Sequence, residues 1–279
     1  MAELCLVGYT YRGYPMAYAL ERAAAYGYGA VEVRNWSDID LSTPSGVAAA
    51  LDRALPLAAE RGLRVHSIFG VPVPAGRAGE DETGRQAFAG TLEALGSRGV
   101  PVCHTWLRVR RDDGREVVSA AAREEDYRRA AEALAWAAPL AERAGVRIAL
   151  ESHMGTIHDT AASLLRVVQS VDSPAVVASP DPANMLITHR QEDLPAAIRA
   201  LGPRIGYVHL KNLKLTPTGY DWNLPLRWGD INYHRVLSAL RDTGYHGPLA
   251  VEYCGTGDPD VFAADDACYL RELAERIGL

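Results

Sequence analysis

The feature that most constrains the fold is a repeated unit made of an amphipathic segment, a glycine and a short apolar run. Clear copies carry their glycine at Gly62, Gly99, Gly145 and Gly244, each followed by an apolar run. A glycine directly after a helix adopts the left-handed conformation without a Cβ clash, so the unit predicts a helix that stops before a strand. Strands that alternate with long helices pair in parallel through helical crossovers.

Eight strands and eight helices are expected from this pattern. The strands are residues 4–8, 30–34, 63–69, 100–107, 146–151, 175–181, 205–211 and 249–253, and the helices are residues 15–26, 44–61, 82–97, 124–144, 160–171, 192–201, 231–243 and 259–277. The chain has 279 residues, about the length of one (β/α)₈ barrel. No GxGxxG motif follows the first strand, which argues against a doubly wound dinucleotide-binding sheet. We therefore predict an α/β chain whose residues 1–279 form a single TIM-barrel domain.

Composition indicates the cellular location of the protein and the kinds of partner that it does not bind. No apolar run reaches the roughly 20 residues that cross a bilayer, and the chain does not open with a signal-peptide pattern. The four cysteines are scattered without a CxxC pair, so we expect reduced thiols and a cytoplasmic location. The net charge of -6 provides no general attraction to a polyanion, so we expect neither a nucleic-acid nor a membrane partner.

Four polar residues fall on the inward-facing parity of the predicted strands. In a parallel barrel, alternate strand residues face the interior, and active sites form at the carboxyl ends of the strands. The four are Glu151, Asp181, His209 and Glu252, all at or near those ends. Each alone could be a satisfied core charge, but carboxylates gathered together repel one another unless a cation neutralises them. The potential ligands are three carboxylates and one imidazole, which are hard donors, and none is a thiolate. We therefore predict one divalent ion, with Mn²⁺ or Mg²⁺ preferred and Co²⁺, Fe²⁺ or Zn²⁺ also compatible.

Other polar side chains are expected around the mouth. His66, His104, Trp106, His153 and Lys211 are candidates for contacts with substrate, although a lone histidine can equally be a satisfied barrel residue. Glu32 and Arg34 share a parity and are interpreted as a pair. The long loop 213–228 carries aromatic residues and Arg227, which we count among the substrate contacts. This loop is either a lid over the barrel mouth or a subunit contact in a homo-oligomer.

Five short motifs resemble the xylose isomerase-like barrel superfamily of sugar isomerases and epimerases. They are Ala149-Leu150-Glu151-Ser152-His153, Asp181-Pro182-Ala183-Asn184, Val208-His209-Leu210-Lys211-Asn212, Trp228-Gly229-Asp230-Ile231-Asn232 and the segment 244–252 that ends at Glu252. The resemblance implies that Glu151, Asp181, His209 and Glu252 are the metal ligands. It also implies that Glu151 and Glu252 transfer the proton. Many members have a histidine where Asn184 stands, and we include Asn184 among the predicted substrate contacts.

The resemblance implies a metal-dependent isomerase or epimerase of a sugar or related polyol. One glutamate would remove a proton beside a carbonyl to form a metal-stabilised cis-enediolate, and the other would return it. Expulsion of a β-hydroxyl from the same species would instead make a dehydratase, acting on a keto-inositol or similar cyclic ketone. The ketose 3-epimerases place an arginine shortly after the histidine ligand. This chain has Lys211-Asn212-Leu213-Lys214 there, which counts against that subgroup.

Two further functions are weighed. Endonuclease IV, a DNA-repair member, holds three zinc ions and needs additional histidines. His66 and His104 could match two of these, but Asn184 and Asn232 stand where others are required, and the chain is acidic. A barrel that has lost catalysis and serves as a partner subunit would not need Glu151 and Glu252, which are both present.

Overall fold

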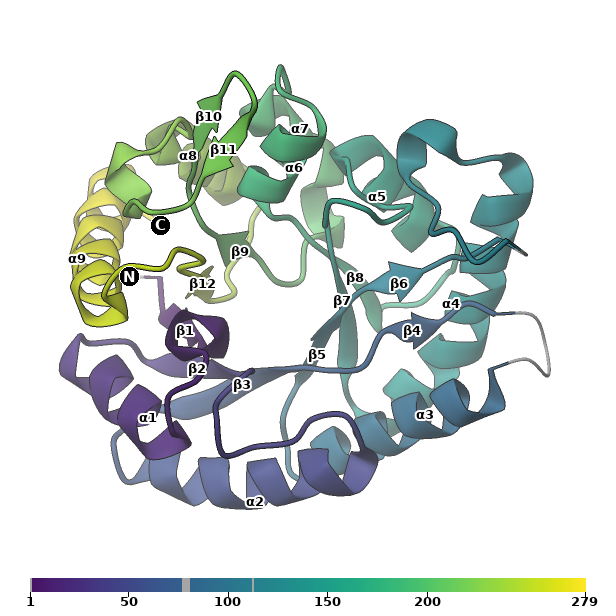
Figure 1. The fold of residues 1–279 in the computed structure, drawn as a ribbon, viewed down its shortest axis with the longest axis horizontal. Helices are drawn as coiled ribbons and strands as arrows, with labels where there is room; N and C mark the ends of the chain where they lie inside the picture. The colour runs from purple at the N-terminus through teal and green to yellow at the C-terminus, as the bar shows by residue number, and fades with distance from the viewer. Residues whose placement is uncertain (1, 77–80, 112) are drawn as a thin grey trace.

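Eight parallel strands form the centre of the computed structural model, which describes residues 2–76, 81–111 and 113–279 (Figure 1). The strands are β1 (Leu4–Val7), β2 (Ala30–Val33), β3 (Arg64–Phe69), β5 (Val102–Thr105), β7 (Arg147–Glu151), β8 (Val176–Ser179), β9 (His209–Leu210) and β12 (Leu249–Val251). Their order in the sheet is β8-β7-β5-β3-β2-β1-β12-β9. The predicted (β/α)₈ barrel is confirmed.

The barrel closes through a thin seam between β8 and β9. A single parallel bridge joins Ala178 to Ile205, and the Gly206 amide donates to the Ala178 carbonyl at 3.0 Å. The His209 amide then donates to the Pro180 carbonyl at 3.1 Å. A Cβ on Gly206 would lie 2.5 Å from the Val177 side chain, so the two segments approach closely at this point.

Helices surround the barrel on its outer face (Figure 1). They are α1 (Met16–Ala25), α2 (Pro44–Ala59), α3 (Glu82–Gly96), α4 (Glu124–Ala144), α5 (Ala161–Gln169), α6 (Pro182–Thr188), α7 (Leu194–Leu201), α8 (Tyr233–Asp242) and α9 (Pro259–Ile277). The start of α2 shows why a helix begins at this point of the sequence. The Thr43 hydroxyl accepts a hydrogen bond from the Gly46 amide at 3.1 Å, and Pro44 occupies the first turn. At the other end of such an element, Gly145 ends α4 in the left-handed conformation with φ 66°.

Four features differ from the sequence prediction. The strand expected at 205–211 is reduced to β9, with an isolated bridge at Ile205. The strand expected at 100–107 is divided, because after β5 the chain leaves the barrel and β6 (Leu107–Arg108) pairs with β4 (Val73–Pro74) instead. The loop 213–228 contains an unpredicted hairpin of β10 (Lys214–Thr216) and β11 (Gly219–Asp221), followed by the 3₁₀ helix η4 (Leu226–Trp228). Helix α6 was also unpredicted. In none of the described helices is there a stretch long and apolar enough to cross a membrane.

The apolar core has two parts of different size. The larger part lies between the strands and the helices, and the smaller part lies inside the barrel. The interior part consists largely of small side chains, including Ala30, Ala149 and Ala250, together with Tyr207. Small residues inside the barrel leave room above them for polar side chains that face the carboxyl ends of the strands.

Candidate metal centre

Four side chains converge at the carboxyl ends of neighbouring strands. Glu151 is the last residue of β7, Asp181 follows β8 by two residues, His209 begins β9 and Glu252 directly follows β12. One potential ligand atom from each lies within 4.8 Å of the others, and all four side chains are buried. The structure thus brings together the four residues that strand parity selected.

The ammonium group of Lys211 lies among the three carboxylates. Its Nζ atom is 2.7 Å from Glu252 Oε2, 2.9 Å from Asp181 Oδ2 and 3.6 Å from Glu151 Oε1. Burial opposes the charge on Lys211, but the surrounding carboxylates outweigh burial and hold its pKa well above the usual range. Lys211 and Arg34, whose guanidinium pairs with Glu252, together carry two positive charges against three carboxylates, so negative charge remains to attract a cation.

Each glutamate is held by a separate pair of donors. The Trp106 indole donates to Glu151 Oε2 at 2.7 Å, and the Asn184 amide donates to Glu151 Oε1 at 3.1 Å. Glu252 accepts from Lys211 and from Arg34 Nη1 at 3.2 Å. Burial acts to raise the pKa of both glutamates, but Lys211 and other cationic neighbours outweigh it and hold both pKa values well below the usual range. Both carboxylates are therefore ionised.

Asp181 divides its two oxygens between the helix and the cluster. Oδ1 caps α6, accepting from the amides of Ala183 at 2.9 Å and Asn184 at 3.1 Å. Oδ2 points to the cluster and makes no hydrogen bond within the described ranges, where its charged neighbour is Lys211. Burial, with the nearby glutamates, raises the pKa of Asp181 to about 7. A buried acid that is this costly to ionise would be stabilised as a carboxylate by a further cation.

His209 also directs an unused atom toward the same point. Its Nδ1 atom is 3.6 Å from Glu151 Oε1 and 3.8 Å from Glu252 Oε2, and it has no hydrogen-bond partner among the residues that the structure describes. Unsatisfied buried polar atoms are rare and call for a physical reason. The unpartnered nitrogen of His209 and the Asp181 oxygen that faces Lys211 lie beside two glutamates, and this donor set fits a divalent metal ion.

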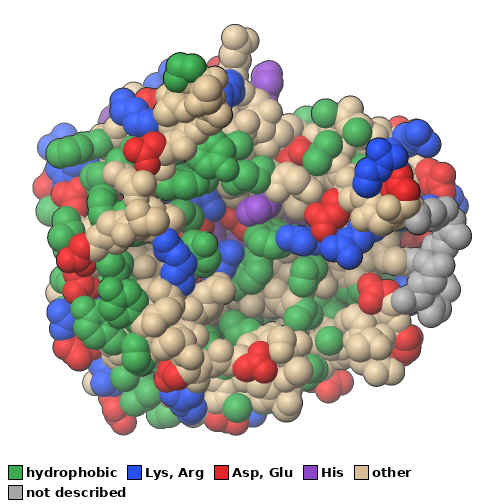
Figure 2. All heavy atoms as spheres, viewed as in Figure 1, with side chains coloured by type: hydrophobic (Ala, Val, Ile, Leu, Met, Phe, Trp, Pro, Cys, Tyr) green, Lys and Arg blue, Asp and Glu red, His purple; other side chains and the backbone are tan. Residues whose placement is uncertain are grey.

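A cavity of about 440 Å³ opens above the cluster. Its lining includes four of the predicted substrate contacts, Trp106, His153, Asn184 and Lys211, together with Glu252. The His153 ring packs against that of Trp106 with 4.2 Å between centroids. Basic, acidic and histidine side chains are visible in the middle of this face of the molecule (Figure 2).

The other three predicted substrate contacts lie elsewhere. His66 lies beside Arg64 and against Tyr207, outside the cavity lining. The pairing of β3 is irregular there, since Val31 pairs with Val65 but Glu32 pairs with Ser67, which leaves His66 as an extra residue. His104 lies below the cluster, with no exposed surface. Arg227 pairs with Asp265 of α9 at 2.9 Å, away from the cavity lining.

Arg34 was assigned the wrong partner from the sequence. It was interpreted as the partner of Glu32, but it pairs with Glu252 and lines the cavity. Its guanidinium lies 3.9 Å from the centre of the Phe69 ring. Phe69 also lines the cavity and was missed. Arg34 and Phe69 lie at the carboxyl ends of β2 and β3, on the same edge as the four clustered residues. This position is the sequence signal that could have identified them as cavity residues.

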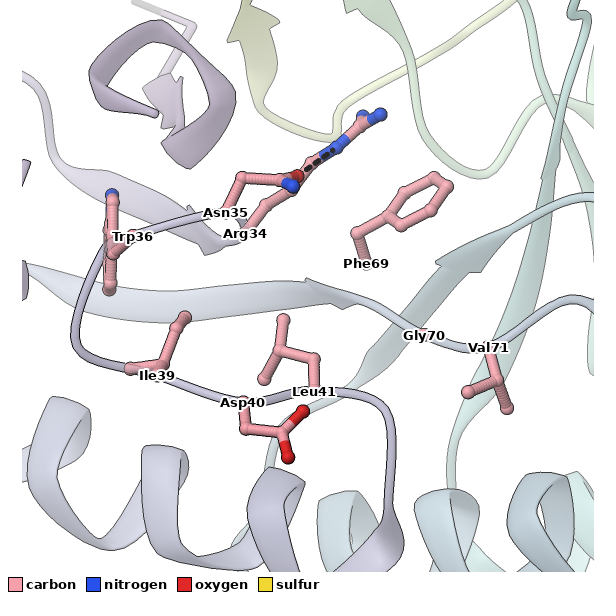
Figure 3. A pocket seen from close by; sticks show the side chains of 9 residues that line it. All are labelled: Arg34, Asn35, Trp36, Ile39, Asp40, Leu41, Phe69, Gly70 and Val71. Atoms are coloured by element: carbon pink, nitrogen blue, oxygen red, sulfur yellow. Dashed lines mark hydrogen bonds between the residues drawn. The ribbon is translucent and has the colours of Figure 1, made fainter. Parts of the chain in front are cut away.

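A second cavity of about 340 Å³ adjoins the first at Arg34, Asn35 and Phe69 (Figure 3). Arg34 and Phe69 project side by side away from this pocket, and Arg34 Nε donates to Asn35 Oδ1 at 3.1 Å. In the loop 213–228, Trp222 lines the first cavity, whereas Trp228 is 69% exposed. One aromatic residue of the loop therefore faces the cavity and another faces solvent.

Comparison with known proteins agrees with this geometry. Residues 20–273 match the family model described as xylose isomerase-like TIM barrel. The chain belongs to this family. The resemblance found in the sequence is thereby confirmed.

Several solved structures share the fold at low identity. D-allulose 3-epimerase from Methylomonas sp. is 17% identical with a TM-score of 0.76, and the match covers 98% of each chain. The probable 3-DHS dehydratase AsbF from Bacillus anthracis is 15% identical with a TM-score of 0.77, covering 96% of this chain and 98% of that one. A barrel from Mycobacterium smegmatis in complex with magnesium is 18% identical with a TM-score of 0.73, covering 99% and 98%. No curated protein sequence matches the chain significantly.

Proposed function

We propose that this protein is a divalent-metal-dependent isomerase or epimerase of a sugar or related polyol. The observation that carries the proposal is the convergence of Glu151, Asp181, His209 and Glu252 within 4.8 Å, below a cavity of about 440 Å³. The D-allulose 3-epimerase of Methylomonas sp., solved in complex with D-allulose, has the same fold and supports a polyhydroxylated substrate.

The four clustered residues would hold one divalent ion. Three carboxylates and an imidazole form a hard set that favours Mn²⁺ or Mg²⁺, with Co²⁺, Fe²⁺ or Zn²⁺ also compatible. The magnesium complex of the Mycobacterium smegmatis barrel supports this choice. When bound, the ion supplies positive charge that stabilises the negative charge developing on a substrate oxygen.

The two glutamates provide the proton transfer. Glu151 and Glu252 are ionised and are held by different neighbours, so each keeps a fixed position. One of them removes the proton from the carbon beside a carbonyl, and the other returns a proton to the opposite face or to the adjacent carbon. The first outcome is epimerisation and the second is isomerisation. His153, Asn184 and Lys211 contact the substrate hydroxyls.

A second candidate is a metal-dependent dehydratase acting on a keto-inositol or similar cyclic ketone. Two observations favour it: the likeness in fold to the probable dehydratase AsbF, and the position of Lys211 within hydrogen-bonding distance of the carboxylate cluster. After a glutamate removes the proton, Lys211 could protonate the departing hydroxyl, and water would leave.

Solvent labelling distinguishes these reactions. We expect the manganese-loaded protein, incubated in D₂O with a panel of ketoses, aldoses and keto-inositols, to convert at least one of them. Deuterium retained in an isomer, followed by NMR, identifies an isomerase or epimerase. Loss of water to give an unsaturated ketone identifies the dehydratase. No exchange and no conversion across the panel would contradict both candidates.

A further inference from the structure

Glu32 lies directly beneath the cluster and is fully buried. It belongs to β2, and its Oε2 atom is 3.3 Å from His209 Nε2 and 3.2 Å from His104 Nδ1. The Ser67 hydroxyl donates to the same oxygen at 3.0 Å, and the Tyr207 hydroxyl lies 2.9 Å from Ser67 Oγ. The carboxylate of Glu32 is therefore held from below while it faces two histidines.

The His209 ring lies between two different environments. Its Nε2 atom faces Glu32, and its Nδ1 atom faces Glu151 and Glu252. A neutral imidazole carries one proton and one lone pair, and a metal binds only the lone pair. A carboxylate beside Nε2 accepts a hydrogen bond from the Nε2 proton and so keeps the proton on that nitrogen. The Nδ1 lone pair is then directed at the cluster.

A second metal ion is the alternative explanation for this arrangement. Glu32, His104 and His209 also offer atoms within 4.8 Å of one another. Ions on both sides of His209 would require the imidazole to lose both ring protons. A hydrogen bond from Nε2 to Glu32 avoids that cost and is already formed at 3.3 Å. The geometry favours one ion above His209 and a hydrogen bond below it.

We infer that Glu32 is a positioning residue that fixes His209 as the tautomer with its proton on Nε2, so that Nδ1 faces the metal site. This inference rests on the proposed metal site but concerns a residue outside the predicted ligand set. In this arrangement the hydrogen-bonded Ser67 and Tyr207 hydroxyls hold the Glu32 oxygen in position.

The tautomer can be observed directly. We expect long-range ¹H–¹⁵N spectra of the ¹⁵N-labelled, Mg²⁺-loaded protein to show one histidine with a protonated Nε2 and an unprotonated Nδ1. Manganese should broaden the same signal most strongly, which identifies it as His209. A His209 signal protonated on Nδ1 and unprotonated on Nε2 in the Mg²⁺-loaded protein would overturn the inference.

Metal affinity gives an independent test. Glu32→Gln keeps the size and one acceptor oxygen but removes the charge. We expect its dissociation constant for Mn²⁺, measured by chelator competition, to rise about 10- to 100-fold, the range found for such partners of a metal-bound histidine. Asp266→Asn is the matched control, because it makes the same acid-to-amide change at another buried residue outside the site, and it should bind Mn²⁺ like the wild type.

The outcomes separate this inference from the proposed function. Wild-type affinity in Glu32→Gln, with unchanged circular dichroism, would overturn the role of Glu32 and leave the metal site intact. Two ions per wild-type chain, falling to one in Glu32→Gln, would make Glu32 a ligand and overturn the role as well. If the wild type binds neither Mn²⁺ nor Mg²⁺, the proposed function fails, and the contact between Glu32 and His209 is then judged by whether Glu32→Gln shifts the His209 Nε2 signals of the metal-free protein.

Discussion

Lys211 places a resident cation where the three carboxylates meet. Its Nζ atom lies 2.9 Å or less from Asp181 and Glu252, and its side chain is 6% exposed. A divalent ion bound by the same oxygens must share them with this ammonium or displace it. We therefore expect Lys211 to stabilise the metal-free protein and to compete with a bound metal ion.

Lys211→Met tests both consequences. Removing one partner from a buried charge cluster typically costs about 3–5 kcal/mol, so the metal-free variant should be destabilised by roughly that amount. We expect Mn²⁺ to recover much of the loss and to bind more tightly than in the wild type. Urea unfolding with and without Mn²⁺ measures the first effect, and chelator competition measures the second. Equal stability of the two metal-free proteins would show that Lys211 does not neutralise the cluster.

The glutamates can be tested by amide substitution. Glu151→Gln and Glu252→Gln each keep the side-chain shape but remove the basic carboxylate. Each should lose on the order of 10²-fold or more in turnover, the scale of a lost general acid–base group. Exchange of substrate hydrogen with D₂O should fall in parallel, measured by NMR. Near-wild-type turnover in a metal-loaded Glu252→Gln protein would exclude the two-glutamate mechanism.

Residue-level prediction from the sequence succeeded where strands are regular. Parity placed Glu151, Asp181, His209 and Glu252 correctly at one end of the barrel. It did not anticipate the extra residue at His66, because a shift in pairing between β2 and β3 cannot be read from alternation of residue types. Pairings such as Arg34 with Glu252 join strands that are far apart in the sequence, and they depend on side-chain packing in three dimensions.

At the scale of elements, a buried acid joins α9 to the long loop. Asp266 of α9 accepts a hydrogen bond from the Leu226 amide of η4 at 2.6 Å. Burial, with the neighbouring Asp265, raises the pKa of Asp266 from 3.8 to about 7. Because the folded pKa is the higher one, protonated Asp266 favours the folded state. This contribution is complete below about pH 4 and is lost as the pH rises through 7.

Asp266→Asn should remove this pH dependence. The amide stays neutral and can still accept the Leu226 hydrogen bond. A shift of about three pKa units corresponds to at most about 4 kcal/mol, so the variant should gain stability relative to the wild type by up to that amount between pH 4 and pH 8. Urea unfolding of both proteins across this range gives the difference. A constant difference would mean that Asp266 does not titrate in this way.

Helices with strong local signals were predicted best. Helices α4 and α9 have the bounds expected from the sequence, since acidic first turns and a terminal glycine mark both. Helix α6 was missed because it has only seven residues and begins immediately after β8. The β10–β11 hairpin was missed because its short strands pair only with each other and show no clear alternation.

At the scale of the whole molecule, the cluster predicts one metal ion per chain. All four candidate ligands surround one point, so elemental analysis of protein purified with Mn²⁺ should find about one ion per chain. Exhaustive chelation should abolish turnover, and added Mn²⁺ or Mg²⁺ should restore it. Full activity with no detectable metal would exclude the proposed chemistry.

The thin closure between β8 and β9 has a mechanical consequence. Asp181 and His209 stand on opposite sides of this seam, which is held in part by the Ala178–Ile205 bridge and the bonds from Gly206 and His209. An ion bound to both residues would link the two sides of this sparsely hydrogen-bonded seam. Local opening should then become rarer, because a ligand that binds only the closed state stabilises it. Hydrogen–deuterium exchange at the Gly206 and His209 amides should slow on metal loading, while the β1–β2 pairing on the far side of the barrel should change little. Metal binding would then both complete the proposed site and keep the barrel closed between β8 and β9.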